Sequence, residues 1–372
     1  MSYRTKALAL AVGLLAMGSW SMPAAAIPDC SQRSMLTRPI ELGVSGGNIH
    51  DVIKNQSGVI KDCFGGTLGS LIQNKNAKQF ILSNNHVLGL ENRAKRGQLI
   101  VQPGLVDTEC AQTPGDAVAT YTRGVHVKPG GAPNVVDAAI AEVEPGQVSA
   151  NILNIGGIAS TVAMPTMGMA VQKMGRTTCL TTGTITALHV NVMIEFGSGV
   201  AKFVNQIKIV GTGDTPFSAG GDSGSLIVTE GSCPQAVGLL FAGANDDSFT
   251  LANRIGAVLR ALSSAPGALS MVGSCTTMAT NDTDQPYDLA ANLGLSNEAV
   301  KAATAVRDRH EADLMSIPGA VGTGIGVGDT PGQPVIEVYV KKLTPQAQAA
   351  TPDEVDGMPV KLIETGGGVV AY

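Results

Sequence analysis

Three residues whose side chains can together transfer an acyl group occur in a fixed order in the chain: His86, Asp137 and Ser223. Acyl transfer by a serine needs a hydroxyl, a base, a group that orients the base, and N–H donors for the oxyanion. Ser223 lies in the Gly-Gly-Asp-Ser-Gly-Ser run of residues 220–225. Such small residues allow a tight turn in which the N–H groups of Gly221 and Ser223 point at one spot. The run alone is equally well explained as a Gly-Asp turn that happens to contain a serine.

The positions of the histidine and the aspartate in the sequence strengthen their assignment as catalytic candidates. His86 follows an apolar, strand-like run that starts at Ile81, and it comes at the exit of that strand. Asp137 stands at the head of the apolar run 135–143, where a buried carboxylate needs a partner and an imidazole supplies one. Each residue by itself is also explained as an ordinary structural or exposed side chain. The order His, Asp, Ser is that of chymotrypsin and differs from the subtilisin and α/β-hydrolase orders. The remaining histidines are weaker candidates: His50, His126, His189 and His310.

The elements that would position these residues are short strands. Aromatic residues make up 3% and charged residues 15% of the chain, and 46 of its 372 residues are glycine. Runs with β-branched residues, separated by Gly, Pro, Asn or Asp, occur at 39–44, 66–72, 79–83, 117–121, 135–143, 170–174, 183–190, 205–210, 226–228 and 236–241. This pattern predicts an all-β barrel or sandwich, closed by a helix over 255–262.

The pattern changes after the break at 263–267 and the polar stretch 276–288. Apolar residues then recur at helical intervals over 297–315, with Ser296 as the expected N-cap. Strands are expected at 320–327, 334–340 and 359–363, with a short helix within 344–356. The expected organisation is a signal peptide (1–26), an N-terminal arm (27–62), a β-rich domain (63–275) and a small α+β domain (289–372).

The N-terminus has the layout of a secretory signal. A basic start precedes the apolar run 7–17, and small residues end at Ala26, where cleavage is favoured. The alternative is a membrane anchor, but the apolar run is too short to span a bilayer and no later stretch is long enough. We therefore expect a secreted or periplasmic protein without a membrane span after signal removal. A net charge of −5 without a basic run argues against nucleic-acid binding.

Together these motifs resemble the chymotrypsin-like serine peptidases, in particular the bacterial branch related to the plant Narrow-leaf trypsin-like proteins. The resemblance covers Cys63 to Leu262. It rests on Gly65–Gly69, Leu82–Val87, Val136–Ala141, the Gly-Arg-Thr-Thr of 175–178 with Thr182-Gly183, and Phe217-Ser218 followed by Gly221–Ser225. It implies two β-barrels with the active site between them. His86 and Asp137 would come from the first barrel and Ser223 from the second.

The sequence departs from the family pattern at several positions. Phe217 stands where trypsin-like enzymes carry a specificity aspartate, so a preference for lysine or arginine is not supported. With Phe241 and Gly243 it would line the substrate pocket, and an apolar or small residue before the scissile bond is expected. Relatives pair the aspartate before the nucleophile with a basic group, and here Lys173 or Arg176 could play that part. Asn84-Asn85 replaces the usual small residues before the histidine, and Phe241 replaces a serine that many relatives bond to the triad aspartate.

All six cysteines lie after the expected cleavage site, and an even number in an exported chain indicates disulfides. Six cysteines allow 15 pairings, so the sequence does not fix the connectivity. With the resemblance as a guide, we expect Cys63–Cys110 to flank the His86 strand and loop. Cys179–Cys233 would tie the second barrel together, which leaves Cys30–Cys275.

The leading hypothesis is an exported serine endopeptidase that acts on protein or peptide substrates without a metal or organic cofactor. A second hypothesis is a catalytically silent, protease-like binding module whose C-terminal domain recognises protein or cell-surface ligands. A third makes the C-terminal unit a cis-acting inhibitor or folding aid, in intramolecular contact with the protease domain.

Overall fold

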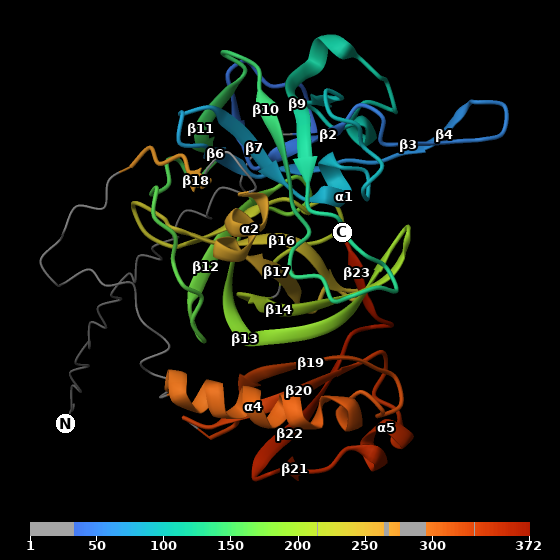
Figure 1. Ribbon diagram of the computed structural model, residues 1–372, viewed down its shortest axis with the longest axis vertical. Coiled ribbons are helices and arrows are strands. Elements are labelled where there is room, and N and C mark those ends of the chain that lie inside the picture. Colours follow the sequence, from blue (N-terminus) through green and yellow to red (C-terminus); the bar gives the residue numbers. More distant parts are fainter. Residues whose placement is uncertain (1–32, 214, 264–267, 276–294, 331) are drawn as a thin grey trace, which may run out of the picture.

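The computed structural model describes residues 33–372 except 214, 264–267, 276–294 and 331. The predicted signal peptide, Cys30 and the polar stretch 276–288 lie outside the described residues. Two large curled sheets form the body of the molecule, and a helix and strands of the C-terminal region form a third layer at one end (Figure 1). The expected chymotrypsin-like all-β fold with a small α+β region is confirmed. No helix among the described residues has both the length and the apolar content needed to cross a membrane.

The first barrel is an eight-stranded sheet in the order β18-β6-β7-β10-β9-β8-β2-β5. Its strands are β2 (Val44–Asn48), β5 (Gly66–Leu68), β6 (Ser70–Gln73), β7 (Gln79–Ser83), β8 (Leu99–Val101), β9 (Ala117–Gly124), β10 (Ala139–Val143) and β18 (Ser270–Met271). The pair β1 (Ile40–Leu42) and β11 (Val148–Ile152) and the hairpin β3 (Val52–Lys54) and β4 (Ile60–Cys63) flank it. The one-turn helix α1 (Asn85–Leu88) follows β7 directly.

The second barrel belongs to an 11-stranded sheet. Its strands are β12 (Ala170–Gly175), β13 (Cys179–Phe196), β14 (Gly199–Gly211), β15 (Leu226–Thr229), β16 (Ala236–Ala244) and β17 (Thr250–Arg254), followed by α2 (Ile255–Leu262). The pairing of β12 with β13 closes these strands into a ring. β13 is 18 residues long, far longer than the expected 183–190, because register shifts let it pair with β14 on one edge and with β19 on the other.

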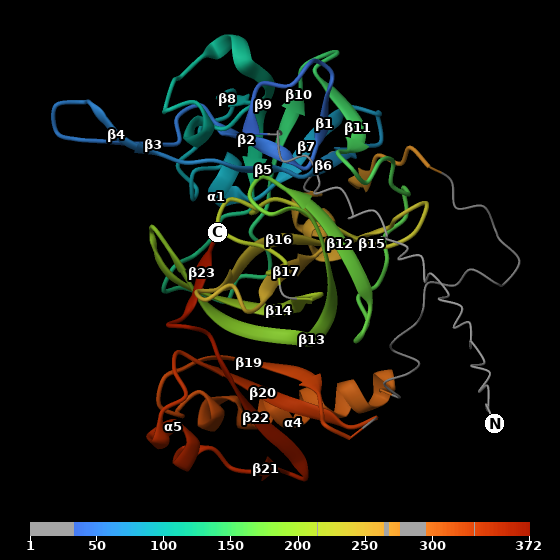
Figure 2. The ribbon, with the colours of Figure 1, turned by 180° about the vertical axis from the view of Figure 1, so that it is seen from behind.

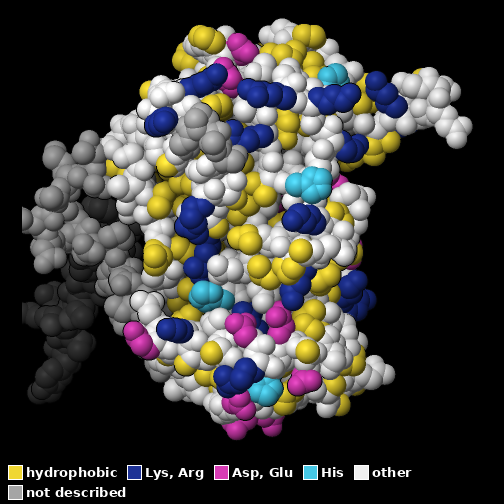
Figure 3. Space-filling view, viewed as in Figure 1, with side chains coloured by type: hydrophobic (Ala, Val, Ile, Leu, Met, Phe, Trp, Pro, Cys, Tyr) yellow, Lys and Arg dark blue, Asp and Glu magenta, His cyan; other side chains and the backbone are white. Residues whose placement is uncertain are grey.

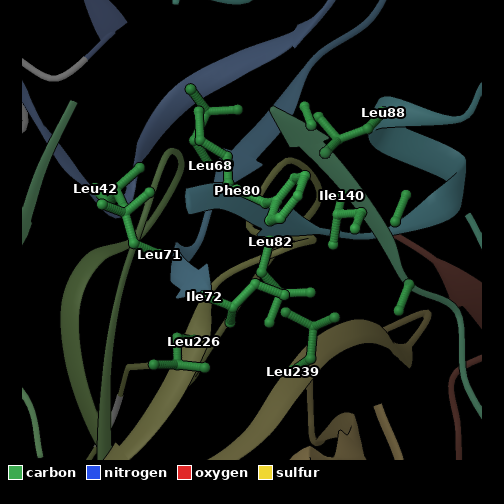
Figure 4. Packing of buried hydrophobic residues seen from close by; sticks show 14 of the residues in the cluster. Leu42, Leu68, Leu71, Ile72, Phe80, Leu82, Leu88, Ile140, Leu226 and Leu239 are labelled. Atoms are coloured by element: carbon green, nitrogen blue, oxygen red, sulfur yellow. The ribbon is translucent and has the colours of Figure 1, made fainter. Parts of the chain in front are cut away.

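One hydrophobic cluster joins the two barrels. Figure 4 shows Ile72 and Leu82 of the first barrel pointing toward Leu226 and Leu239 of the second. All four side chains are fully or almost fully buried. Burial of apolar surface stabilises by roughly 25 cal/mol per Å², so this contact holds the two barrels in a fixed relation. The relation matters because the predicted site draws on both.

Two predicted boundaries need correction. The segment 27–62 was expected to be an arm, but β2 pairs with β5 and β8 inside the first barrel. Gly46 permits this close approach, since a Cβ on it would collide with the side chain of Leu68. The C-terminal region is not a detached unit, because β19 pairs antiparallel with β13 and continues the sheet of the second barrel.

The C-terminal layer contains α4 (Asn297–Leu314), β19 (Ala320–Val327), β20 (Pro334–Val340), α5 (Pro345–Ala350), β21 (Glu354–Val355), β22 (Met358–Glu364) and β23 (Val369–Ala371). Ser296 caps α4 as predicted, since its side chain accepts a hydrogen bond from Ala299 N. β23 leaves this layer and returns to the second barrel, where it pairs with β16 and β13 (Figures 1 and 2). Acidic side chains gather over this layer on the face seen in Figure 3, while Lys and Arg are spread over the same face.

The disulfides differ in part from expectation. Cys63–Cys110 is present, and the two Cα atoms are 5.5 Å apart. The expected Cys179–Cys233 and Cys30–Cys275 bridges are wrong, because Cys233 is bonded to Cys275. This bridge joins the segment after β18 to the turn between β15 and β16. The sequence did not predict it, because the two segments become neighbours only in the folded chain. Cys179 is also disulfide-bonded.

A buried ion pair fastens the C-terminal layer to the second barrel. Lys208 Nζ of β14 lies 2.5 Å from Glu337 Oε2 of β20, which also accepts a hydrogen bond from the Tyr339 hydroxyl at 2.6 Å. Lys208 and Glu337 are both about 5% exposed or less. Removing one partner of such a pair leaves the other charge buried without compensation.

We therefore expect Glu337→Gln to lower the free energy of unfolding by about 3–5 kcal/mol. Urea denaturation followed by circular dichroism measures this change. The control is Lys361→Ala, which breaks the exposed Lys361–Asp329 contact of 3.6 Å and should change stability by no more than about 0.5 kcal/mol. A loss for Glu337→Gln as small as that of the control would contradict the prediction.

Candidate active site

The pairing of two strands brings His86 and Asp137 together. β7 and β10 run antiparallel with Ser83 opposite Ala139. The residues just after β7 and just before β10 therefore emerge at the same edge of the first barrel. His86 sits there on α1, and its Nδ1 lies 2.5 Å from Asp137 Oδ2. Asp137 precedes β10, which begins later than the predicted strand 135–143.

The Asp137 carboxylate is fully buried and its oxygens are well supplied with donors. Its Oδ1 accepts hydrogen bonds from the backbone N–H groups of Asn85 at 2.8 Å and His86 at 3.2 Å. The side chain of Asn84 donates to the Asp137 carbonyl at 2.7 Å, and Asn253 Oδ1 accepts from the Asp137 N–H at 2.9 Å. These bonds fix the carboxylate in the orientation that an orienting group needs. They also give the side chain of Asn84 a role, while Asn85 contributes its backbone N–H.

Ser223 is held in a loop of the second barrel that contacts the first. Its carbonyl accepts a hydrogen bond from Thr67 N of β5 at 2.8 Å, and Thr67 Oγ1 donates to the Gly221 carbonyl at 3.0 Å. Glycine at 224 is required here, because φ is +94° and a Cβ would collide with Ser83 Oγ and the Thr67 carbonyl. Sequence reasoning missed Thr67, although it lies in one of the motifs that carry the resemblance.

Hydrogen bonds to two carbonyls fix the orientation of the predicted oxyanion donors, because each carbonyl belongs to the same peptide unit as one of these N–H groups. The carbonyl of Gly220 accepts from Thr177 Oγ1 at 2.7 Å, and the carbonyl of Asp222 accepts from Ser225 Oγ at 2.7 Å. In a trans peptide the N–H points opposite to the C=O of the same unit. The N–H groups of Gly221 and Ser223 therefore point away from these partners, and Gly221 borders a cavity of about 730 Å³ that His86 also lines.

No hydrogen bond joins the side chains of His86 and Ser223 in this structure. Ser223 Oγ donates to the carbonyl of Phe241 at 3.2 Å. His86 Nε2 instead lies 2.8 Å from the carbonyl oxygen of Tyr372. The structure thus brings His86 and Asp137 together, while Ser223 is fully buried and follows Gly221, which lines the same cavity as His86. The sequence did not predict Tyr372, the partner of His86 Nε2, as a residue of the site.

The charge state of His86 follows from its two neighbours. Burial lowers the pKa of His86, but the Asp137 carboxylate and the Tyr372 carbonyl outweigh burial, so the pKa is raised above its ordinary value. A carbonyl and a carboxylate can only accept, so both ring nitrogens act as donors. In this arrangement the imidazole is protonated and cannot take a proton from Ser223.

The predicted pocket residues lie in two places. Phe217 is buried among the apolar residues of the second barrel, and its ring lies 5.8 Å from Lys173 Nζ. Phe241 points into an aromatic cluster, with its ring centroid 4.9 Å from that of Phe203. Only Gly243 meets the cleft directly, because a Cβ on it would collide with the ring of Tyr372.

The carboxylate of Asp222, the residue before Ser223, is hydrogen-bonded by groups of the second barrel. Its Oδ1 accepts from Thr177 N at 2.7 Å, and its Oδ2 accepts from Thr178 Oγ1 at 2.7 Å. Lys173 Nζ lies 3.7 Å from Asp222 Oδ2 and donates to Thr178 Oγ1 at 2.6 Å. Of the two basic candidates, Arg176 makes a two-point ion pair with Asp107, at 2.8 and 2.6 Å.

Lys173 is fully buried, and burial lowers its pKa from 10.5 to about 8 despite the Asp222 carboxylate. Between about pH 8 and 10.5 the unfolded chain therefore binds a proton that the folded chain has lost, and stability rises with pH across this window. We expect the free energy of unfolding of wild type, relative to that of Lys173→Met, to rise by about 3 kcal/mol from pH 8 to 10.5. Urea denaturation of both proteins at several pH values measures it. A difference that stays constant over the window would refute the assignment.

The chain resembles known proteins over part of its length. The family described as the Nal1 C-terminal domain matches residues 143–264, the part that contains Ser223. No curated protein matches the chain. The chain is similar to the solved structure of a glutamic-acid-specific serine protease, with 18% identity over 63% of this chain and 100% of the other and a TM-score of 0.41.

Two further solved structures have named sources. The Nocardiopsis protease has 17% identity over 56% of this chain and 92% of its own, with a TM-score of 0.39. The Cellulomonas bogoriensis chymotrypsin has 18% identity over 63% of this chain and 100% of its own, with a TM-score of 0.38. These likenesses carry no argument about catalysis. The chain has a chymotrypsin-like serine protease fold, and its residues 143–264, which include the strands of the second barrel, match the model of the Nal1 C-terminal domain.

Proposed function

We propose that the protein is an exported serine endopeptidase. The observation that carries the proposal is the 2.5 Å contact between His86 Nδ1 and the fully buried, hydrogen-bonded Asp137 carboxylate, beside a cavity that Gly221 of the Ser223 loop also lines. A buried carboxylate orients an imidazole and stabilises its charged form, which is what a general base for a serine requires. The domain limits that go with this proposal are a protease core of residues 63–275 and a C-terminal domain of residues 289–372.

In the proposed reaction, His86 Nε2 takes the proton of Ser223 Oγ as this oxygen attacks the carbonyl carbon of the scissile peptide. The N–H groups of Gly221 and Ser223 stabilise the oxyanion, and the protonated His86 then gives its proton to the leaving amine. Water, activated by His86, hydrolyses the acyl-enzyme and restores Ser223. Asp137 remains ionised and keeps the imidazole in the required tautomer.

Export is supported by the bridges Cys63–Cys110 and Cys233–Cys275, since disulfides persist in oxidising compartments. The second candidate function is a silent binding module. The hydrogen bond between His86 Nε2 and the Tyr372 carbonyl favours it for the conformation seen here, because this conformation holds the base away from Ser223.

A fluorophosphonate probe tests the nucleophile, because it reacts covalently with an activated serine. We expect wild type and Tyr372→Ala to be labelled and Ser223→Ala to remain unlabelled. Tyr372→Ala is included because the carbonyl oxygen of Tyr372 is hydrogen-bonded to His86 Nε2 in this structure. Intact-protein mass spectrometry gives the readout. Absence of labelling in both Ser223-containing proteins would favour the silent module, and equal labelling of Ser223→Ala would remove Ser223 from its role.

Substitution of the proposed base and its orienting group should nearly abolish hydrolysis. We expect His86→Ala and Asp137→Asn each to lower kcat/KM for peptide substrates by about 10³–10⁴-fold, because the base is lost or adopts the wrong tautomer. The matched control is His126→Ala, an exposed histidine of the first barrel, which should keep full activity. Rates within a factor of three of wild type for either triad variant would reject the triad.

A further inference from the structure

The last strand of the chain lies in the active-site cleft. β23 pairs antiparallel with β16, with Val369 opposite Ala244, Val370 opposite Gly243 and Ala371 opposite Ala242. On its other edge it makes one parallel pairing with β13, between Val370 and Glu195. The end of the chain stands beside α1, the helix that carries His86, in both ribbon views (Figures 1 and 2). The strand therefore lies along the wall that leads to the reacting groups.

The backbone of Tyr372 is hydrogen-bonded beside Ser223 and His86. Its N–H donates to the Phe241 carbonyl at 3.3 Å, the same carbonyl that accepts from Ser223 Oγ. Its own carbonyl oxygen lies 2.8 Å from His86 Nε2. The strand therefore brings a backbone carbonyl into contact with the proposed base.

The side chain of Tyr372 fills a pocket with a polar end. The ring passes over Gly243, where any larger residue would collide with it. The hydroxyl lies 2.9 Å from Asp247 Oδ1 and 3.3 Å from the Ala244 carbonyl. Burial, and then the Asp247 carboxylate, raises the pKa of Tyr372, so the phenol stays neutral and donates. An apolar slot that ends in a carboxylate suits a tyrosine side chain, and a guanidinium would be the competing occupant.

The other half of the cleft remains open. The cavity of about 730 Å³ begins at Ala371 and Tyr372 and continues past His86, with Arg93 and Phe196 among its walls. The cavity therefore continues from the strand toward the first barrel.

The tail is also fastened on its way into the cleft. Asn245 N lies 3.0 Å from the Thr365 carbonyl and 3.1 Å from that of Gly368, and Asn245 Nδ2 donates to the Gly366 carbonyl at 3.0 Å. These bonds hold the turn between β22 and β23 against the end of β16. A ligand tethered this closely has an effective concentration on the order of millimolar. A segment with an intrinsic Kd of ~0.1 mM would then lower the activity on an added substrate about tenfold.

We propose that the primary specificity pocket takes a tyrosine side chain, with Gly243 and Asp247 as its determinants, and that residues 369–372 occupy it as an intramolecular competitor of this substrate class. The proposal rests on the proposed peptidase function for its catalytic part and on the pocket alone for its binding part.

Hydrolysis tests the catalytic part. Chromogenic peptides of the form Val-Val-Ala-X, with X as Tyr, Phe, Leu or Arg, are given to wild type, Tyr372→Ala and the control Lys361→Ala. We expect Tyr372→Ala to raise kcat/KM for the tyrosine peptide about tenfold, chiefly through a lower apparent KM. Lys361→Ala should match wild type, and the order of preference should be Tyr, then Phe, with Arg last. A preference for Arg, or no gain in Tyr372→Ala, would overturn the proposal.

Binding separates failure of the inference from failure of the peptidase function. In Ser223→Ala chains, fluorescence anisotropy of a labelled Val-Val-Ala-Tyr peptide should show about tenfold tighter binding when Tyr372 is also replaced by alanine. Adding Asp247→Ala to that double variant should weaken the tyrosine peptide and leave the phenylalanine peptide unchanged. Equal binding with and without the native tail residue would overturn the inference, even if Ser223 proves to be catalytic. Thermal melts of each variant show that it is folded.

Discussion

The buried carboxylate of Asp137 is the constraint around which the site is organised. A charge without access to water is costly unless donors surround it. Here the donors come from α1, through the backbone of Asn85 and His86, and from the imidazole itself. The antiparallel register of β7 and β10 makes this possible, because it puts the residues that leave one strand next to those that enter the other. The His86 ring is thus positioned by the satisfaction of a buried charge.

The serine depends on contacts that cross between the barrels. Thr67 binds two carbonyls of the Ser223 loop, and the loop closes only with glycine at 221 and 224, where φ is positive. Below the loop, Asp222 is held by Thr177, Thr178 and the buried Lys173. The hydrophobic cluster between the barrels keeps these polar contacts in register.

The C-terminal layer connects the stability of the second barrel to the state of the site. β19 extends the barrel sheet, Lys208 and Glu337 join the two parts, and β23 returns into the cleft. In this conformation His86 Nε2 is hydrogen-bonded to the carbonyl oxygen of Tyr372, and Ser223 Oγ donates to the carbonyl of Phe241. The same strand that completes the sheet therefore also sets the resting state of the base.

The sequence by itself determined the all-β class, the limits of β19, β20 and α2, the cap at Ser296 and the identity of the candidate triad. These follow from local patterns: alternation, turn residues, capping and the order of three functional side chains. The partners of Cys233, the inclusion of β2 in the first barrel and the position of Phe217 and Phe241 were decided by tertiary structure, because they depend on which distant segments pack together. The three residues of β23 carry no periodicity that predicts a strand. Their place in the cleft follows only from pairing with β16, and so the contact between Tyr372 and His86 could be found only in the folded chain.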